Sequence, residues 1–338
     1  MSATATHAAV LLPEVLTALN IRASGAYLDA TFGRGGHAGA MLEKLSAEGR
    51  LLCLDRDPRA IAEARARFGA DPRVHIFHAP FSRLAACADR VREGLELDGI
   101  LLDVGVSSPQ LDDPERGFSF LKDGPLDMRM SEGEGASAAD VVNRAPEAEL
   151  KRIFREYGEE RFAGRIARAI VADRAVRPFT RTGELAGLIE RVVRAAAGGR
   201  GGRRGRGGSE GAPGGGGGER SKHPATRVFQ ALRIHVNQEL EELGAALEAA
   251  RSRLAPHGRL AVISFHSLED RMVKQFLRRH SSVDPVYAGL PVIPATARPT
   301  LRLVGRSIEP SPEEIARNPR SRSARLRVAE RIAPGDVA

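Results

Sequence analysis

The first residues that could do chemistry lie in the stretch Asp29–His37, which reads DATFGRGGH. Its glycines let the backbone turn tightly and approach a ligand closely. Asp55 stands 22 residues beyond Gly33, where an acid at the end of the next strand can accept both hydroxyls of a ribose. A plain tight turn with an exposed acid is the alternative, but the two features coincide at a spacing that favours a nucleoside site.

Two classes of cofactor compete for this site. Gly33, Gly35 and Ala38 fit the loose fingerprint of a nicotinamide dinucleotide enzyme. Asp29 counts against that class, because a carboxylate just ahead of the glycines repels a pyrophosphate and can instead meet the ammonium of a methionine group. A candidate hairpin near the end of the chain, in place of a second mononucleotide-binding half, counts against it too. The pattern favours S-adenosylmethionine, and the choice between the two cofactors depends on motifs later in the chain.

The elements that would position these residues alternate between strand and helix. Continuous apolar strands separated by helices indicate a parallel sheet covered on both faces. The expected strands are Ala26–Ala30, Arg50–Leu54, Val74–Phe77, Gly99–Val104 and Leu260–Phe265, and the expected helices between and after them are Gly36–Leu45, Pro58–Phe68, Val236–Leu254 and Leu268–Arg279. Two extended segments, Pro291–Arg306 and Ser323–Glu330, would close the sheet as a hairpin. We expect an α/β fold with the Rossmann-like sheet of class I methyltransferases.

Between the fourth and fifth strands the pattern changes and predicts helices at Ala148–Tyr157, Glu160–Arg174 and Gly183–Arg194. We expect the first part of a methyltransferase domain at 1–112, a helical insertion for substrate recognition at 113–197, a Gly/Arg-rich linker at 198–221, and the second part with a basic tail at 222–338. The linker is too rich in glycine to bury a core and should be disordered. An inert linker is favoured over an Arg-Gly arm that touches RNA.

The composition limits which partners and which cellular compartment are expected. The 338 residues carry a net charge of +8, with 46 Arg against 5 Lys. An excess of Arg reflects either a genome rich in G and C or phosphate binding, since the guanidinium fork matches phosphate oxygens. No apolar run reaches the roughly 18 residues that a membrane span needs. Cys53 and Cys87 lack metal-type spacing and are expected as buried thiols, which favours the cytoplasm.

Longer strings appear after the fourth expected strand. They are DVGVSSPQLDD at 103–113, ERGFSF at 115–120, DGPLDMRM at 123–130, HPATR at 223–227, FQALRI at 229–234, VNQEL at 236–240, SFHSLEDR at 264–271 and NPRSRSARLR at 318–327. In this order they closely resemble the bacterial 16S ribosomal RNA (cytosine-N4)-methyltransferases, the RsmH or MraW family. The resemblance runs from His7 to about Glu330 and departs from the family's usual short link at the Gly/Arg tract, where the flanking motifs are intact.

The resemblance implies methylation of the exocyclic N4 amine of a cytosine in the decoding region of 16S ribosomal RNA, with S-adenosylmethionine as cofactor. It places cofactor contacts at Gly35, Gly36, His37, Asp55, Phe81, Asp103 and Gln110. The residues alone leave two of these open. Phe81 could stack on adenine or pack as an ordinary core side chain with equal ease, and Gln110 would be taken for a loop residue.

The catalytic residues expected are Asp103, Ser108 and Pro109. Amino-methyltransferases commonly carry a Ser/Asn/Asp-Pro-Pro-aromatic loop after the fourth strand, and Ser108-Pro109-Gln110 occupies that place without the second proline and the aromatic. Backbone carbonyls near Ser107 and Ser108 would then accept the amine. Asp103 would orient the amine or bind the cofactor alone, with equal weight.

His266 and Asp270 lie on the same expected rim and could line the base pocket, with a structural hydrogen bond favoured for His266. No required metal is expected, because the His and Cys residues lack ligand spacing. The expected partner is 16S ribosomal RNA in the small ribosomal subunit, with no membrane and a possible homodimer. The net charge and the Arg-rich segment Arg317–Arg327 suit its phosphate backbone, and the helical insertion could grip so large a substrate. A binding-only RNA chaperone would explain the charge but not the pairing of Gly35 with Asp55.

Overall fold

The computed structural model describes residues 9–198, 223–287, 289–333 and 335–336. The chain divides into two compact units, Met1–Ser107 with Glu239–Ala338 as unit 1 and Ser108–Gln238 as unit 2. These boundaries differ from the expected 113 and 222, because the short helix that starts at Ser108 and the helix that ends at Asn237 cluster with the inserted helices. The tract expected as a linker lies outside the described residues, apart from Gly198, which ends a helix.

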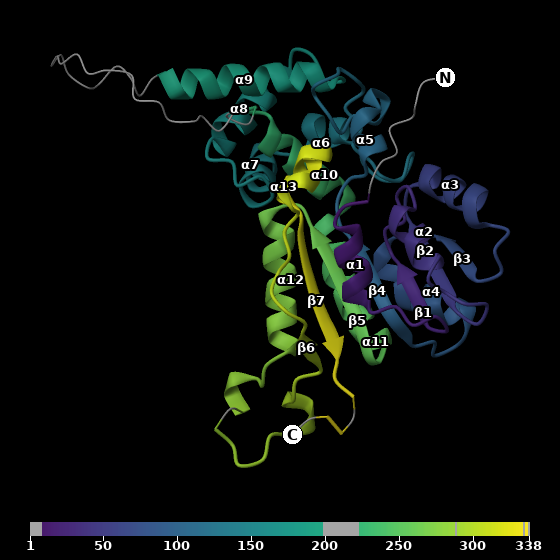
Figure 1. The fold of residues 1–338 in the computed structure, drawn as a ribbon. Coiled ribbons are helices and arrows are strands. Elements are labelled where there is room, and N and C mark those ends of the chain that lie inside the picture. Colours follow the sequence, from purple (N-terminus) through teal and green to yellow (C-terminus); the bar gives the residue numbers. More distant parts are fainter. Residues whose placement is uncertain (1–8, 199–222, 288, 334, 337–338) are drawn as a thin grey trace, which may run out of the picture. The chain divides into compact units, whose positions relative to one another are not determined.

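Unit 1 is built on a seven-stranded sheet with the order β3-β2-β1-β4-β5-β7-β6. The strands are β1 (Ala26–Asp29), β2 (Arg50–Asp55), β3 (Val74–His78), β4 (Leu97–Asp103), β5 (Leu254–Ser264), β6 (Leu301–Leu303) and β7 (Arg325–Arg331). The first five strands are parallel to one another, while β7 is antiparallel to both β5 and β6. This arrangement confirms the expected Rossmann-like sheet of class I methyltransferases closed by a hairpin (Figure 1).

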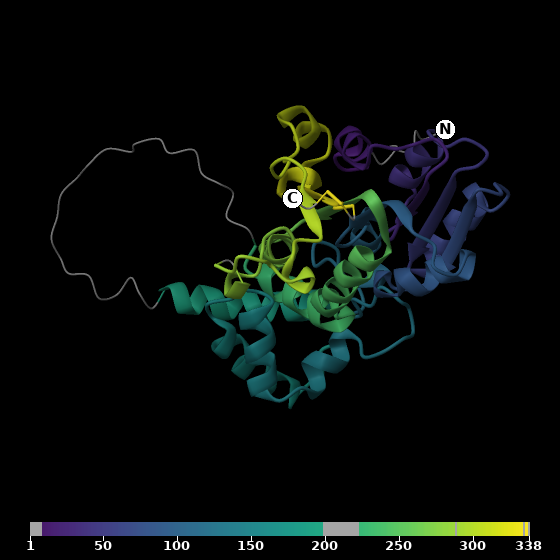
Figure 2. The ribbon, with the colours of Figure 1, turned by 90° about the horizontal axis from the view of Figure 1, so that it is seen from below.

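Helices cover both faces of the sheet (Figures 1 and 2). The helices that cover the sheet are α1 (Leu12–Leu19), α2 (Gly36–Leu42), α3 (Pro58–Phe68), α4 (Leu84–Val91), α11 (Glu239–Arg253) and α12 (Ser267–His280). Unit 1 also contains the short α13 (Pro312–Arg317) and 3₁₀ turns that include η1 (Phe81–Arg83) and η6 (Pro319–Ser323). Alternate residues of one strand serve opposite faces: Leu51 joins the core under α1, α2 and α3, while Leu52 joins the core under α4, α11 and α12. Burial on both sides explains why the strands are apolar throughout.

The strand order reverses between β1 and β4, since the chain runs outward from β1 to β3 and then returns to the other side of β1. Ligands of open parallel sheets bind beyond the carboxyl ends of the strands at such a switch point. The site is therefore expected at the ends of β1, β2 and β4, with β5 flanking it.

Unit 2 is helical. It contains α5 (Ser108–Asp112), η2 (Pro114–Arg116), α6 (Ala138–Arg144), α7 (Glu147–Glu156), α8 (Ala163–Arg174), α9 (Thr182–Gly198) and α10 (Thr226–Asn237). Its core joins apolar faces of α7, α8, α9 and α10, for example Phe154, Ile166, Ile189 and Leu232, all fully buried. The three helices expected from the sequence are present within a few residues of their expected bounds.

The single helix expected over Val236–Leu254 is wrong. Gln238 takes a left-handed conformation, with φ 51°, that ends α10, and α11 begins at Glu239. The two extended tail segments do form a hairpin, although β6 spans a mere three residues. Both cysteines are buried and free, as expected. No helix in the described part of the chain is long and apolar enough to cross a membrane.

Candidate active site

Four carboxylates follow one another along the carboxyl edge of the sheet. Asp55, Asp29 and Asp103 are the last residues of β2, β1 and β4, and Glu269 lies in the first turn of α12, just after β5. Their charges act on one another in strand order, because Asp55 raises the pKa of Asp29, and both Asp29 and Glu269 raise the pKa of Asp103. We call these four residues the acidic edge.

Asp29 is buried, with 1% of its surface exposed. Burial raises its pKa to about 7, and the charge of Asp55 adds to the shift. One oxygen, Oδ1, accepts the Thr31 N–H at 3.1 Å, while Oδ2 has no hydrogen-bond partner among the described residues. A buried acceptor without a partner is costly, so this oxygen is suited to a ligand that brings a donor.

Asp55 braces the glycine loop. Its Oδ2 accepts the Gly33 N–H and its Oδ1 accepts the Asp57 N–H, both at 2.8 Å. Burial raises its pKa to about 6, against the lowering effect of these hydrogen bonds. Each carboxylate oxygen can accept a second hydrogen bond, so the bracing leaves room for ribose hydroxyls.

Asp103 lies next to His37, with Oδ2 3.7 Å from Nδ1. Burial raises the pKa of Asp103 to about 8, and its Oδ1 has no hydrogen-bond partner in the described part of the chain. Burial lowers the pKa of His37 to about 4, and Nε2 lies 2.9 Å from the Val10 carbonyl. The imidazole is therefore neutral at pH 7, with its proton on Nε2 and Nδ1 as an acceptor that faces Asp103. The contact is not an ion pair.

The three glycines of the loop have different roles. Gly33 and Gly35 have positive φ values of 54° and 67°. A Cβ on Gly35 would lie 2.5 Å from the buried ring of Phe32, and one on Gly36 would lie 2.9 Å from Ala9, whereas one on Gly33 would meet nothing closer than 3.8 Å. Gly35 is thus required by packing within the protein, and Gly33 is the position that leaves open space.

The remaining expected residues are distributed between the units. Phe81 opens η1 directly after β3 and is partly buried against the core beneath α4 and α11, so the packing role has structural support. The first turn of α5 in unit 2 contains Ser108, Pro109 and the buried Gln110. All three residues are therefore helical.

The two residues expected on the rim, His266 and Asp270, have different partners. Asp270 accepts two hydrogen bonds from the guanidinium of Arg327, at 2.7 and 3.1 Å, and thereby ties α12 to β7. His266 lies 3.0 Å from Glu269 through Nε2 and Oε1. Sequence reasoning missed Glu269, although its position three residues after His266 at a helix start matches the spacing of a capping box.

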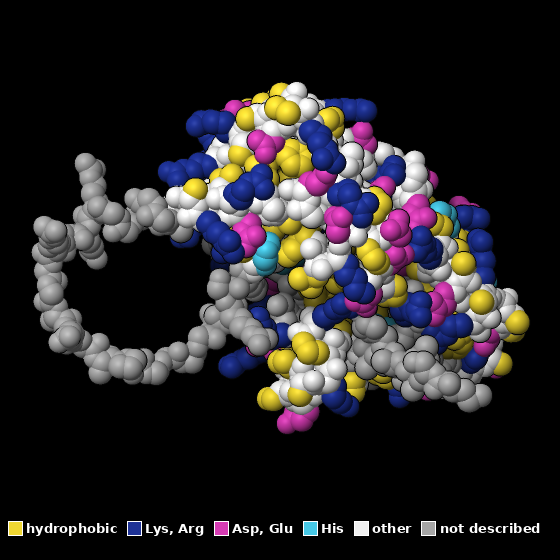
Figure 3. All heavy atoms as spheres, turned by 90° about the horizontal axis from the view of Figure 1, so that it is seen from above, with side chains coloured by type: hydrophobic (Ala, Val, Ile, Leu, Met, Phe, Trp, Pro, Cys, Tyr) yellow, Lys and Arg dark blue, Asp and Glu magenta, His cyan; other side chains and the backbone are white. Residues whose placement is uncertain are grey.

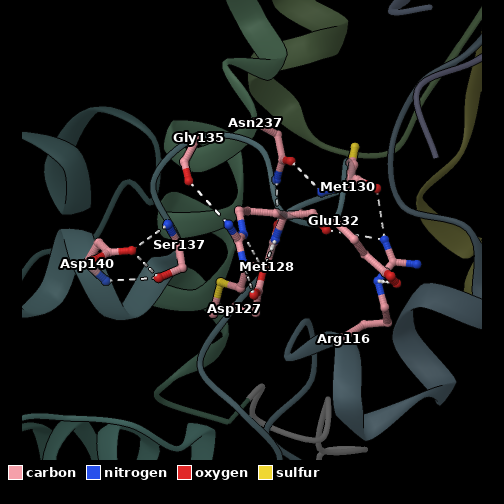
Figure 4. A network of polar contacts seen from close by, with 10 residues as sticks. Arg116, Asp127, Met128, Met130, Glu132, Gly135, Ser137, Asp140 and Asn237 are labelled. Atoms are coloured by element: carbon pink, nitrogen blue, oxygen red, sulfur yellow. Dashed lines mark hydrogen bonds and ion pairs between the residues drawn. The ribbon is translucent and has the colours of Figure 1, made fainter. Parts of the chain in front are cut away.

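Family-motif residues of unit 2 hold one loop in place (Figure 4). Asn237, at the end of α10, accepts the Met130 N–H and donates to the Met128 carbonyl, each at 2.8 Å. The buried guanidinium of Arg116 donates to the Met130 carbonyl at 2.9 Å. These contacts stabilise Met128 in a left-handed conformation with φ 63°, which is uncommon for a side chain of this size.

The acidic edge can bind a ligand that carries positive charge and several donors. Three of its buried oxygens, Asp29 Oδ2, Asp103 Oδ1 and Glu269 Oε1, have no hydrogen-bond partner among the described residues, and neighbouring carboxylates disfavour an anionic ligand beside them. The arrangement therefore favours a ligand with an ammonium group over one with a pyrophosphate.

Comparison with known proteins agrees with this geometry. The MraW methylase family matches residues 4–332. The ribosomal RNA small subunit methyltransferase H of Shewanella amazonensis is 51% identical over 334 residues, which is 98% of this chain and 99% of that protein. The protein of the same name from Thioalkalivibrio sulfidiphilus is 54% identical over 328 residues, with 97% and 98% covered. A solved rRNA methylase from Streptococcus thermophilus is distant, with 11% identity, a TM-score of 0.37, and 96% and 93% covered. The chain belongs to the MraW methylase family, and it is a methyltransferase.

Proposed function

We propose that this methyltransferase transfers the methyl group of S-adenosylmethionine to the exocyclic N4 amine of a cytosine in the decoding region of 16S ribosomal RNA. The acidic edge is the observation that carries the choice of cofactor, because a row of buried and partly buried acids favours a cationic ligand. The names of the relatives at about half identity support ribosomal RNA as the substrate. The motif strings quoted above support the N4 amine.

The bound cofactor would supply an electrophilic methyl group on a sulfonium. Asp29, through its unpartnered Oδ2, would accept from the ammonium of the methionine group. Asp55 would accept the ribose hydroxyls while it holds Gly33. Gly35, Gly36 and His37 would shape the loop around the methionine end, and Phe81 and Gln110 would complete the site.

The amine of cytosine is a weak nucleophile, because its lone pair is delocalised into the ring. An acceptor for one N–H favours localisation of the lone pair, and a fixed position converts the transfer into an effectively intramolecular step. Asp103 has a free Oδ1 for this purpose, with His37 held in a fixed tautomer beside it. The carbonyls at Ser108 and Pro109 would supply further acceptors.

The substrate would be the small ribosomal subunit or a precursor, because a buried methyl donor requires an unstacked base. This substrate would place the enzyme in the cytoplasm. Figure 3 shows Lys and Arg side chains interspersed with acidic ones on the face in view, so RNA would be held by scattered phosphate contacts. A homodimer remains a prediction, which sedimentation of the purified chain tests.

The test is a labelling experiment. The enzyme and S-adenosylmethionine with a labelled methyl group are incubated with purified small subunits, naked 16S ribosomal RNA, transfer RNA and free cytidine. We expect label in ribosomal RNA, recovered after digestion as N4-methylcytidine. Label on transfer RNA or cytidine, with none on ribosomal RNA in any form, would refute the proposal.

A further inference from the structure

Two aromatic rings from distant parts of the sequence stack on each other in unit 2, and neither belongs to the site described above. Phe120 ends the string at 115–120, and His223 begins the string at 223–227. Their ring centroids lie 4.6 Å apart, with an angle of 33° between the ring planes. The fold of unit 2 thus joins two of the family strings through a ring contact.

The stack is anchored in the core of unit 2. Phe229 of α10 is 4% exposed and packs edge to face against Phe120, with ring centroids 4.8 Å apart and ring planes at 71°. Aromatic pairs prefer such geometry. Phe120 is partly exposed and lies against His223, which is exposed. Three rings therefore lead from the interior to the surface, and the outermost ring is open to solvent.

Backbone hydrogen bonds fix the orientation of His223 before any ligand binds. Its Nδ1 accepts the Ala225 N–H at 3.2 Å, and its carbonyl accepts the Thr226 N–H at 3.0 Å. In the neutral ring the proton therefore lies on Nε2, as a donor that the turn does not use. Asn and Asp are the residues that commonly accept a backbone N–H two residues ahead. The turn alone does not explain an imidazole at this position.

Positive charge accompanies the stack. Lys122, two residues after Phe120, is exposed and forms no ion pair within the part of the chain that the structure describes. Arg227 is exposed as well, and its guanidinium donates to the Glu159 carbonyl at 3.2 Å. The acid that follows Lys122, Asp123, is already paired with Arg181. Cations next to an exposed ring suit a ligand that combines planar bases with phosphates.

We infer that the His223–Phe120 pair is a stacking platform for an unpaired base of the RNA substrate. This inference rests on the proposed function, because that function makes RNA the ligand. Single-stranded parts of RNA are recognised largely by stacking of their bases on aromatic rings, histidine included. The exposed ring of His223 receives the base, Phe120 and Phe229 hold that ring from behind, and Lys122 meets a neighbouring phosphate. The base is the target cytosine or one that flanks it.

Two variants separate the ring of His223 from its hydrogen bond. His223→Asn keeps an acceptor for the Ala225 N–H and removes the ring, whereas His223→Phe keeps a ring and removes the acceptor. Equilibrium binding to small subunits from a strain that lacks the methyl group is measured by cosedimentation. We expect His223→Asn to weaken binding by about 5–150-fold, the effect of removing one ring that stacks on a base. His223→Phe should bind within about threefold of wild type, which is the reverse of what a role in the turn alone would give.

The matched control is His235→Asn. His235 lies near the other end of α10 and stacks on Tyr157, with ring centroids 6.3 Å apart, and its substitution should leave binding unchanged. Single-turnover methylation with saturating subunits distinguishes the two candidate bases. The maximal rate of His223→Asn should fall if the platform holds the target cytosine, and it should stay near that of wild type if the platform holds a flanking base.

Binding within threefold of wild type in a folded His223→Asn protein would overturn the inference. Equal losses in His223→Asn and His223→Phe would overturn it too, because they would assign the effect to the turn. Failure of the proposed function is distinct, since wild type would then leave the subunits unlabelled, whereas the binding measurement requires no methyl transfer.

Discussion

At the scale of single residues, a carboxylate of the site already accepts hydrogen bonds from the protein backbone when no ligand is bound. Asp55 holds the glycine loop through Gly33 and the next turn through Asp57. Its spacing from Gly33 predicted a ribose acceptor, and the structure adds a bracing role that spacing could not reveal. The two roles are compatible because they use different lone pairs.

We predict that Asp55→Ala weakens S-adenosylmethionine binding by about 10–100-fold, which corresponds to the roughly 1.5–3 kcal/mol of a hydrogen bond to a charged group. The matched variant Asp71→Ala removes another carboxylate that accepts a backbone N–H, here that of Arg73, away from the acidic edge, and it should bind normally. Calorimetry measures both. Unchanged affinity in a folded Asp55→Ala protein would remove this residue from the site.

Gly33 and Gly35 give a second prediction at this scale. Both have positive φ, so Ala at either position is strained by roughly 1–2 kcal/mol. Gly35→Ala also places a methyl against the ring of Phe32 and should lower the melting temperature further. Gly33→Ala has space around it and should affect ligand affinity more than stability. Thermal unfolding with and without cofactor separates the two, and equal losses of stability would show that the Phe32 contact is unimportant.

At the scale of elements, the helices and strands that the sequence predicted correctly are those whose ends are marked by capping residues or by proline. Pro58 in the first turn, after an Asp N-cap, sets the start of α3 at the predicted residue. Periodicity could not reveal the break at Gln238, because α10 and α11 both present apolar residues at helical spacing and no Gly or Pro stands between them. The short β6 follows a proline-containing segment whose extended pattern resembles a longer strand. Glu269 was missed because its partner is a histidine, a rare N-cap.

The loop that Asn237 holds in unit 2 depends on contacts between distant parts of the sequence. Asn237→Ala would leave the Met128 carbonyl and the Met130 N–H without their buried partner. We expect a loss of about 2–6 kcal/mol in unfolding free energy, from two unsatisfied groups at 1–3 kcal/mol each. Asn143→Ala removes a similar pair of bonds to Phe179 in a partly exposed setting and should cost less. Urea unfolding followed by circular dichroism compares them, and an equal cost would contradict the role assigned to burial.

At the scale of the whole molecule, charged side chains are arranged differently on the surface and at the acidic edge. The face drawn in Figure 3 mixes basic and acidic side chains. Two arginines of the segment expected to bind RNA have acidic partners, since Arg327 pairs with Asp270 and Arg325 with Glu309. The acidic edge instead brings four carboxyl groups together, of which Asp29 and Glu269 are fully buried. Composition revealed the net charge but not this separation, because burial depends on which strand ends lie next to one another.

The acidic edge should make the stability of the ligand-free protein fall as pH rises. The folded-state pKa values of Asp29, about 7, and Asp103, about 8, lie above the roughly 3.9 of an unfolded chain. Between these limits the folded protein binds more protons than the unfolded one, so stability is fully present below about pH 4 and is lost as pH rises through the folded values. His37 opposes this trend, because its pKa is lowered to about 4, but its opposition ends near pH 6.5.

Between pH 6.5 and 8.5 the change in unfolding free energy therefore reflects the titration of Asp29 and Asp103. We predict that the unfolding free energy of wild type falls there by up to about 1.4 kcal/mol per pH unit for each titrating group. The variant Asp103→Asn should show a clearly smaller slope, because it removes the carboxylate of the acidic edge with the highest pKa. S-adenosylmethionine should reverse the wild-type trend, since a cation favours the ionised edge and its affinity should rise with pH. Urea titrations across this window, with and without the cofactor, measure both effects. A slope that is the same in wild type and Asp103→Asn would mean that the edge is ionised before the ligand binds.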